Sequence, residues 1–158
     1  MVIYVDGSVT GNPGGVVGYG WSCPEEKQSG FGAAFSGGGS ATNNVSEYIG
    51  VAAAMIWALD YVPKGKKILV RCDSELTVNQ LNGLWRVKHA NLKPIAAIVH
   101  MMIETLSERG VTVAAEWIPR ENNRVADDLS RRAVKNQLKE RYMMNQREKR
   151  EKDSSHRE

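Results

Sequence analysis

Four carboxylates in this sequence stand where strands and helices are expected to bring side chains together. Asp6 and Asp73 each follow directly after a short apolar run that has the composition of a strand. Glu47 and Asp127 each lie in the first turn of a helical pattern, off its apolar stripe. Because sites in α/β sheets gather outside the carboxyl ends of strands, we expect the two aspartates at one edge of a sheet.

Four carboxylates that converge on one point would repel one another unless cations filled the site. All-oxygen ligand sets favour hard ions such as Mg²⁺ or Mn²⁺. Two such ions about 3.5–4 Å apart are the standard arrangement for in-line attack of water on a phosphodiester. The alternative is that each acid is a cap or a solvated side chain, with Asp73 capping the helix after it, since acids are favoured at helix N-termini.

The elements that must position these acids follow from hydrophobic periodicity. Three strands come first, then a helix, a strand, two helices, a strand and a final helix. Their apolar positions span residues 2–5, 16–22, 31–35, 45–59, 68–72, 75–81, 92–106, 111–117 and 125–133. This order predicts an α/β fold with a mixed sheet, antiparallel hairpins first, and helices on its faces.

The charge of the 158-residue chain is unevenly distributed. The formal net charge is +3, from 21 Lys and Arg against 18 Asp and Glu. Residues 135–158 hold eight basic and five acidic residues, which leaves 13 of each in residues 1–134. We interpret the tail as a solvated, mixed-charge extension, docked at most through residues 142–144 and frayed or disordered from Glu148 onward. Phosphate binding by its basic residues is the alternative.

Several classes of protein are excluded or disfavoured. No apolar run approaches the roughly 18–20 residues that span a bilayer, so we expect no membrane partner. Residues 1–6 do not have the basic region and long apolar stretch of a secretory signal, and their composition is typical of a strand. Cys23 and Cys72 have no metal-binding spacing and are interpreted as buried thiols, so we expect a cytoplasmic protein.

Four motifs surround the four acids in order along the chain. They are Tyr4-Val5-Asp6-Gly7-Ser8 with Gly11-Asn12-Pro13-Gly14; Thr42-Asn43-Asn44-Val45-Ser46-Glu47; Cys72-Asp73-Ser74 with Val78-Asn79-Gln80-Leu81-Asn82-Gly83; and Trp117-Ile118-Pro119-Arg120-Glu121-Asn122-Asn123 with Ala126-Asp127-Asp128-Leu129-Ser130. Together they resemble the type 1 ribonuclease H family over about residues 1–134.

The resemblance implies a ribonuclease H-like fold: a mixed five-stranded sheet, three antiparallel strands first, with helices on both faces. Residues 1–137 would form the catalytic domain and residues 138–158 a charged tail that is partly helical or disordered. Asp6, Glu47, Asp73 and Asp127 would be catalytic acids that bind two Mg²⁺ ions, with Mn²⁺ as a substitute. A monomer would hydrolyse the RNA strand of RNA–DNA hybrids and leave 5′-phosphate and 3′-hydroxyl ends.

The resemblance also implies contacts with the hybrid. Asn12, Thr42 and Asn43 match positions that touch its backbone, where the 2′-hydroxyl distinguishes RNA from DNA. The two asparagines could equally be turn or cap residues. Glu75 matches a substrate-contacting position that is often Gln.

An aromatic and basic segment follows the short helix. Trp85, Lys88 and His89 are the expected contacts with the DNA strand. Alternatively, Trp85 is a core residue and His89 an ordinary surface residue.

The sequence departs from the family pattern in two ways. Many members have a His before the last catalytic Asp, but residues 119–124 contain none, and we expect Arg120 or Glu121 to modulate turnover instead. The segment after Trp85 is too short for the basic protrusion of some members. Two other functions stay open: a non-catalytic hybrid-binding module, and another nuclease on the same fold.

Overall fold

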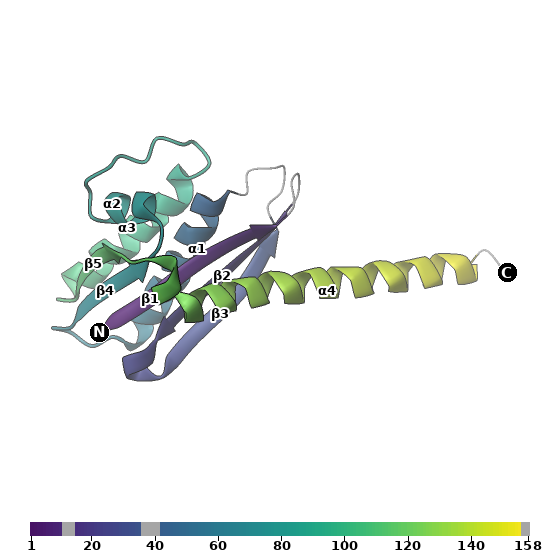
Figure 1. Cartoon of the computed structure of the whole chain (residues 1–158), viewed down its shortest axis with the longest axis horizontal. Coiled ribbons are helices and arrows are strands. Elements are labelled where there is room, and N and C mark those ends of the chain that lie inside the picture. The colour runs from purple at the N-terminus through teal and green to yellow at the C-terminus, as the bar shows by residue number, and fades with distance from the viewer. Residues whose placement is uncertain (11–14, 36–41, 156–158) are drawn as a thin grey trace.

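The computed structural model describes residues 1–10, 15–35 and 42–155. It contains one five-stranded mixed sheet, on which the helices pack. The strand order is β3-β2-β1-β4-β5 (Figure 1). Strands β1 (Val2–Thr10), β2 (Val16–Cys23) and β3 (Gln28–Phe35) form an antiparallel meander. Strand β4 (Lys67–Cys72) pairs parallel to β1, and β5 (Thr112–Trp117) pairs parallel to β4. The predicted fold class is therefore confirmed.

Helices cover both faces of this sheet. Helices α1 (Asn43–Tyr61), α2 (Glu75–Leu81) and α3 (Lys93–Glu108) lie on one side, and α4 (Arg124–Ser155) packs across β1, β2 and β3 on the other (Figure 1). Short 3₁₀ turns at Pro24–Glu26 and Arg120–Asn122 complete the elements. Within the described parts of the chain, no helix has the length and apolar composition needed to cross a membrane.

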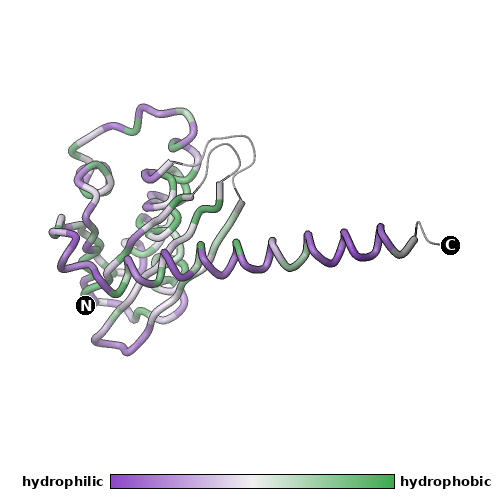
Figure 2. The backbone as a smooth tube through the Cα atoms, turned by 45° about the vertical axis from the view of Figure 1, so that its right-hand side comes forward, coloured by the Kyte–Doolittle hydropathy of each residue, from purple (hydrophilic) through white to green (hydrophobic). Residues whose placement is uncertain are grey.

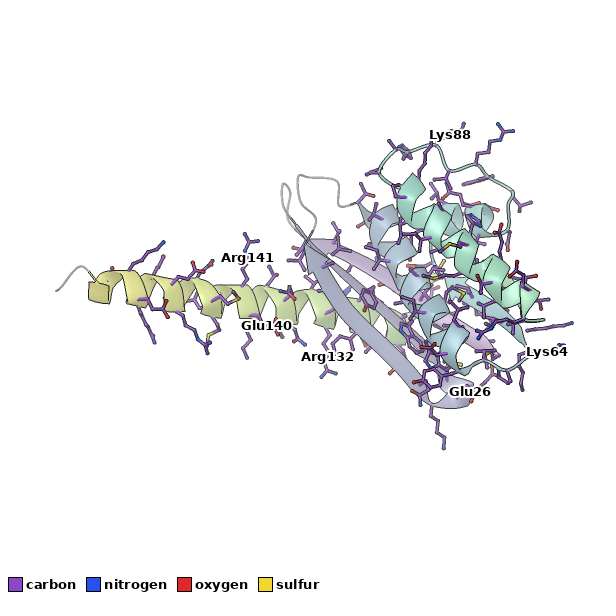
Figure 3. All side chains as sticks on the ribbon, turned by 180° about the vertical axis from the view of Figure 1, so that it is seen from behind. Glu26, Lys64, Lys88, Arg132, Glu140 and Arg141 are labelled. Carbon is purple, nitrogen blue, oxygen red and sulfur yellow. The ribbon has the colours of Figure 1, made fainter. Side chains whose placement is uncertain are left out.

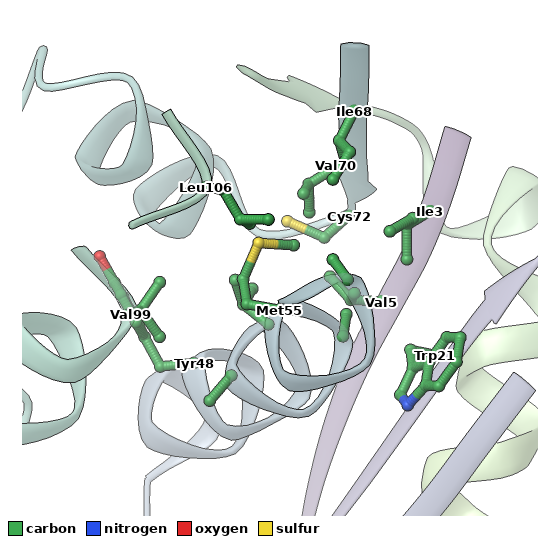
Figure 4. Packing of buried hydrophobic residues seen from close by; sticks show 14 of the residues in the cluster. Ile3, Val5, Trp21, Tyr48, Met55, Ile68, Val70, Cys72, Val99 and Leu106 are labelled. Atoms are coloured by element: carbon green, nitrogen blue, oxygen red, sulfur yellow. The ribbon is translucent and has the colours of Figure 1, made fainter. Parts of the chain in front are cut away.

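The hydrophobic core lies between the sheet and helices α1 and α3. Alternate residues of the strands point into it, as the period-two pattern of a strand requires. Both cysteines are buried free thiols, as predicted. Residues labelled in Figure 4 include Ile3, Val5, Tyr48, Met55, Ile68, Val70, Cys72, Val99 and Leu106.

The first turns of α1 and α2 are fixed by side-chain caps. Thr42 accepts a hydrogen bond from the backbone N–H of Val45 at 3.3 Å, as its type and position predict. Ser74, rather than Asp73, caps α2 by accepting from the Thr77 N–H at 3.2 Å. The expectation that Asp73 caps this helix is therefore wrong, and its carboxylate is available for other contacts.

Two glycines allow helices to lie directly on the sheet. A Cβ at Gly7 would come within 2.3 Å of the Glu47 backbone nitrogen, so the first turn of α1 rests on β1. On the other face, a Cβ at Gly20 would lie 2.6 Å from the carbonyl oxygen of Ala126 in α4. These close approaches bring three elements that carry acids, β1, α1 and α4, to the same end of the sheet.

Helix α4 is longer than the sequence suggests. It continues through Ser155, beyond Glu148, where we expected a frayed or disordered end. Residues 142–144 do not dock, because all three side chains are at least half exposed. Opposite charges one turn apart, Arg147 with Glu151 and Lys149 with Asp153, favour helix in a segment whose side chains are exposed.

Candidate active site

A cleft of about 490 Å³ opens at the end of the sheet where the carboxylates were predicted to meet. Asp6 of β1, Glu47 of α1 and Asp73 after β4 each place a carboxylate oxygen within 4.8 Å of the other two. Asp6 is 3% exposed and Glu47 is 7% exposed, whereas Asp73 is half-buried. The structure thus brings together three of the four predicted acids, from three different elements.

Burial and mutual repulsion make the charged forms of these acids costly. Burial raises the pKa of Asp6 to about 6, and the charges of Asp73 and Asp127 act in the same direction. A hydrogen bond from the Ser130 hydroxyl to Asp6 Oδ2 partly offsets this rise. Burial also holds the pKa of Glu47 well above its ordinary value, with further increases from Asp6 and Asp73.

The donor set fits a hard divalent cation. The three side chains offer only oxygen ligands, which is the chemistry that Mg²⁺ and Mn²⁺ prefer. Glu47 Oε2 is buried and has no hydrogen-bond partner, which is a costly state for a carboxylate oxygen unless a ligand satisfies it. A cation at this point would satisfy that oxygen and offset the repulsion that raises the two pKa values.

Asp127 lies beside this cluster but is not one of its three members. Its Oδ1 accepts from Arg120 Nη2 at 2.7 Å, and its Oδ2 lies 3.1 Å from Arg131 Nε. Both arginines line the same cleft as the three acids. The fourth predicted acid is therefore near enough to raise the pKa of Asp6, yet two guanidinium groups neutralise it.

Three polar side chains hold the acidic residues in place. The Ser130 hydroxyl lies 2.5 Å from Asp6 Oδ2, to which it donates, and 2.9 Å from the backbone carbonyl oxygen of Asp127, so it ties Asp6 to the first turn of α4. The indole of Trp117 donates to the backbone oxygen of Asp73 at 3.2 Å. The Asn123 amide donates to the Val5 backbone oxygen at 2.8 Å, next to Asp6. These roles depend on contacts between residues that are distant in the sequence, so no local pattern could have revealed them.

Five of the predicted substrate contacts line the cleft or two neighbouring pockets. Asn43 lines the acidic cleft, and Thr42 borders a small cavity that also touches His89. His89 in turn lines a second pocket of about 520 Å³ together with Trp85 and Lys88. His89 thus joins the small cavity to the second pocket, and Thr42 of that cavity is next in sequence to Asn43 of the acidic cleft.

Trp85 is not a core residue. Its side chain is 49% exposed and borders the second pocket, which excludes the alternative of burial under the next helix. The segment that carries Trp85 is fixed to the core by the buried Gln80. The Gln80 side chain donates to the Arg86 backbone oxygen and accepts from the Tyr48 hydroxyl.

Two predicted contacts are not placed at the cleft. Glu75 is exposed in the first turn of α2 and does not line the described cleft or pockets. Asn12 lies outside the described residues.

Residues 5–133 match the family model described as reverse transcriptase-like. The chain belongs to this family. The sequence resemblance to its type 1 ribonuclease H members is confirmed by the solved structures that the fold matches.

Two of these structures cover nearly the whole fold. The N-terminal RNase H domain of Rv2228c from Mycobacterium tuberculosis superposes with a TM-score of 0.72 at 30% identity, over 88% of this chain and 96% of that one. LC11-RNase H1, isolated from compost and solved in complex with an RNA/DNA hybrid, gives a TM-score of 0.68 at 30% identity, over 87% and 98%.

The curated relatives are longer proteins. The bifunctional protein Rv2228c of M. tuberculosis is 34% identical over an alignment of 143 positions, which covers 85% of this chain and 35% of that protein. Ribonuclease HI of Halobacterium salinarum is 31% identical over 135 residues, which is 83% of this chain and 62% of that protein. The chain therefore spans about a third of the first relative and less than two thirds of the second.

Replacing Glu47 by Gln should stabilise the metal-free protein. A buried acid with a raised pKa destabilises the fold once pH rises above its ordinary pKa of 4.5, and the loss grows until pH passes the folded-state value. Glu47→Gln should therefore raise the thermal midpoint by a few degrees at pH 8 in a chelator, with a smaller gain at pH 5. Added Mg²⁺ should narrow the difference by stabilising the wild type.

The exposed Asp128 provides the matched control, because Asp128→Asn removes the same charge outside the cluster. Equal midpoints for Glu47→Gln and the wild type at pH 8 would contradict the electrostatic account of this site.

Proposed function

We propose that this chain is a metal-dependent endoribonuclease that hydrolyses the RNA strand of RNA–DNA hybrids and leaves 5′-phosphate and 3′-hydroxyl ends. The observation that carries the proposal is the buried cluster of Asp6, Glu47 and Asp73 in an open cleft. Membership of the type 1 ribonuclease H family supports it, as does the hybrid bound to the related LC11-RNase H1.

In this proposal, Asp6, Glu47 and Asp73 hold divalent cations, and Asp127 joins them for a second ion. If these acids held two Mg²⁺ ions, the chemistry supplied would be activation of a water and neutralisation of the leaving oxygen. The chain fixes Asp6 through Ser130 and fixes the Asp73 backbone through Trp117, so the carboxylates need little rearrangement to bind. For Asp127 to join them, its carboxylate must exchange at least one arginine for the ion.

The surface beside the acids suits a duplex with two different strands. Thr42 and Asn43 stand next to the cleft, where their polar side chains can contact the ribose 2′-hydroxyl and backbone of an RNA strand. The exposed Trp85 offers a stacking or sugar-packing surface, and Lys88 offers a charge to the phosphates of the other strand. Because His89 lines both the cavity beside Thr42 and the pocket beside Trp85, it supports a path between these two contacts.

Cleavage assays on three duplexes test this function directly. The wild type should cut the RNA strand of a labelled hybrid in Mg²⁺, and should leave double-stranded RNA and double-stranded DNA intact. Asp73→Asn should lower cleavage by at least about a thousandfold, because it removes one of three carboxylates from the cation site. Asp128→Asn is the matched control and should cleave like the wild type.

Each contrary result has a defined meaning. Hybrid binding without cleavage in either Mg²⁺ or Mn²⁺ would replace the proposal with a non-catalytic binding module. Cleavage of double-stranded DNA would indicate another nuclease on the same fold.

Arg120, rather than Glu121, is positioned to modulate turnover. Arg120 lines the cleft and donates to Asp127, whereas Glu121 borders a different pocket beside Pro24 and Val125. A hydrogen bond to a charged partner contributes about 1.5–3 kcal/mol, which corresponds to tenfold or more in rate if it is used in the reaction. We therefore expect Arg120→Ala to lower kcat about tenfold.

Titration with Mg²⁺ separates this role from simple metal binding. Loss of Arg120 should also lower the Mg²⁺ concentration needed for half-maximal activity, because Asp127 loses a competing cation. Glu121→Ala, the control, should change neither quantity. Unchanged kcat in both variants would remove this loop from the mechanism.

A further inference from the structure

The side of α4 that faces the cleft continues well past the sheet. Arg131 and Val134 line the acidic cleft, so their side of the helix is the cleft-facing side. We take the direction halfway between Arg131 and Val134 around the helix axis as the midline of this side. At 3.6 residues per turn, the later residues that lie within about 60° of this midline can be identified. Those positions are Leu138, Arg141, Tyr142, Asn145, Lys149 and Lys152.

Charges that alternate in the sequence are partly separated on this helix. From Arg131 to Asp153, the cleft-facing side holds four basic residues and no acidic residue. Glu140 and Glu151 fall on the far side, whereas Glu148 and Asp153 flank the cleft-facing side at about 70° from its midline. Figure 3 shows Arg141 on one side of α4 and Glu140 with Arg132 on the other. Acidic and basic residues therefore alternate more closely along the sequence than they do on this side of the helix.

This part of α4 is hydrophilic along most of its length (Figure 2). Its apolar side chains end at Met144, and Met143 and Met144 do not share the cleft-facing side. A coiled-coil seam would need apolar residues repeated over several more turns. A basic strip with an aromatic residue, Tyr142, instead suits a polyanion.

We propose that the cleft-facing side of α4, defined by Arg131, Arg141, Lys149 and Lys152 around Tyr142, binds the phosphate backbone of the hybrid beyond the acidic cleft. The strip from residue 131 to residue 152 is about 32 Å long at about 1.5 Å per residue. At about 3.4 Å per base pair, it can follow roughly nine base pairs of duplex. The proposal rests on the proposed function, since it assigns a second contact surface to the same substrate.

The strip also explains how a chain without the basic protrusion could hold its substrate. Residues 1–134 have no net charge, and the surplus of basic residues lies in α4 and the last residues of the chain. Because Arg131 lines the cleft itself, the strip is continuous with the site of cleavage. Beyond Arg131, which pairs with Asp127, the next basic residue on this side is Arg141, about 15 Å further along the helix.

Two triple variants with the same charge change test this proposal. The first is Arg141→Gln, Lys149→Gln and Lys152→Gln, on the cleft-facing side. The second, the matched control, is Lys139→Gln, Arg147→Gln and Arg150→Gln, on the other sides of the same helix segment. All six side chains are exposed, so both variants should fold, and circular dichroism checks their helix content.

Binding is measured in Mg²⁺ on an Asp73→Asn background, with a hybrid of 30 base pairs and one of eight. The cleft-facing triple should weaken binding of the long hybrid at least tenfold and reduce the slope of log K against log salt by about two to three. The control triple should change affinity less than twofold. On the short hybrid, the difference between the two triples should disappear.

Equal losses in the two triples would overturn the proposal in favour of a general charge effect, and no loss in either would overturn it outright. Failure of the proposed function is distinguishable, because it would appear as absence of hybrid cleavage by the wild type.

Discussion

Burial of carboxylates that also repel one another is the constraint on which the rest of this structure depends. Asp6, Glu47 and Asp73 come from β1, α1 and the end of β4, and the fold holds them within reach of one ion. The raised pKa of Asp6 and of Glu47 records what this arrangement costs without a cation. Close packing at Gly7 and the hydrogen bond from Ser130 maintain this arrangement of carboxylates. The fold is therefore less stable than it could be, and its metal ligands are already in position.

Positive charge is distributed around that cluster in a way that the net charge conceals. Arg120 and Arg131 neutralise Asp127 and line the cleft without pairing with the three central acids. The neighbourhood thus offers a place for a cation and a cationic rim for a phosphate backbone. Helix α4 connects the two features, since it carries Asp127, Ser130 and Arg131 within its first two turns.

Much of this could be predicted from the sequence, because strand ends, helix starts and ordered motifs are local signals. The acids Asp6, Glu47 and Asp73 and the Thr42 cap follow from such patterns. The choice of Ser74 over Asp73 as a cap, and the contact of Asn123 with Val5, depend on which partner lies nearer in space. The extent of α4 was missed because charge pairs one turn apart stabilise a helix without an apolar stripe.

The central claim is that Asp6, Glu47 and Asp73 form a divalent-cation site, and crystals soaked in Mn²⁺ test it most directly. An anomalous difference map should show a peak at direct coordination distance from an oxygen of each of the three side chains. Crystals of Glu47→Gln, treated identically, should show a weaker peak. A map with no peak at the cluster at saturating Mn²⁺, or with Mn²⁺ bound only elsewhere, would contradict the account.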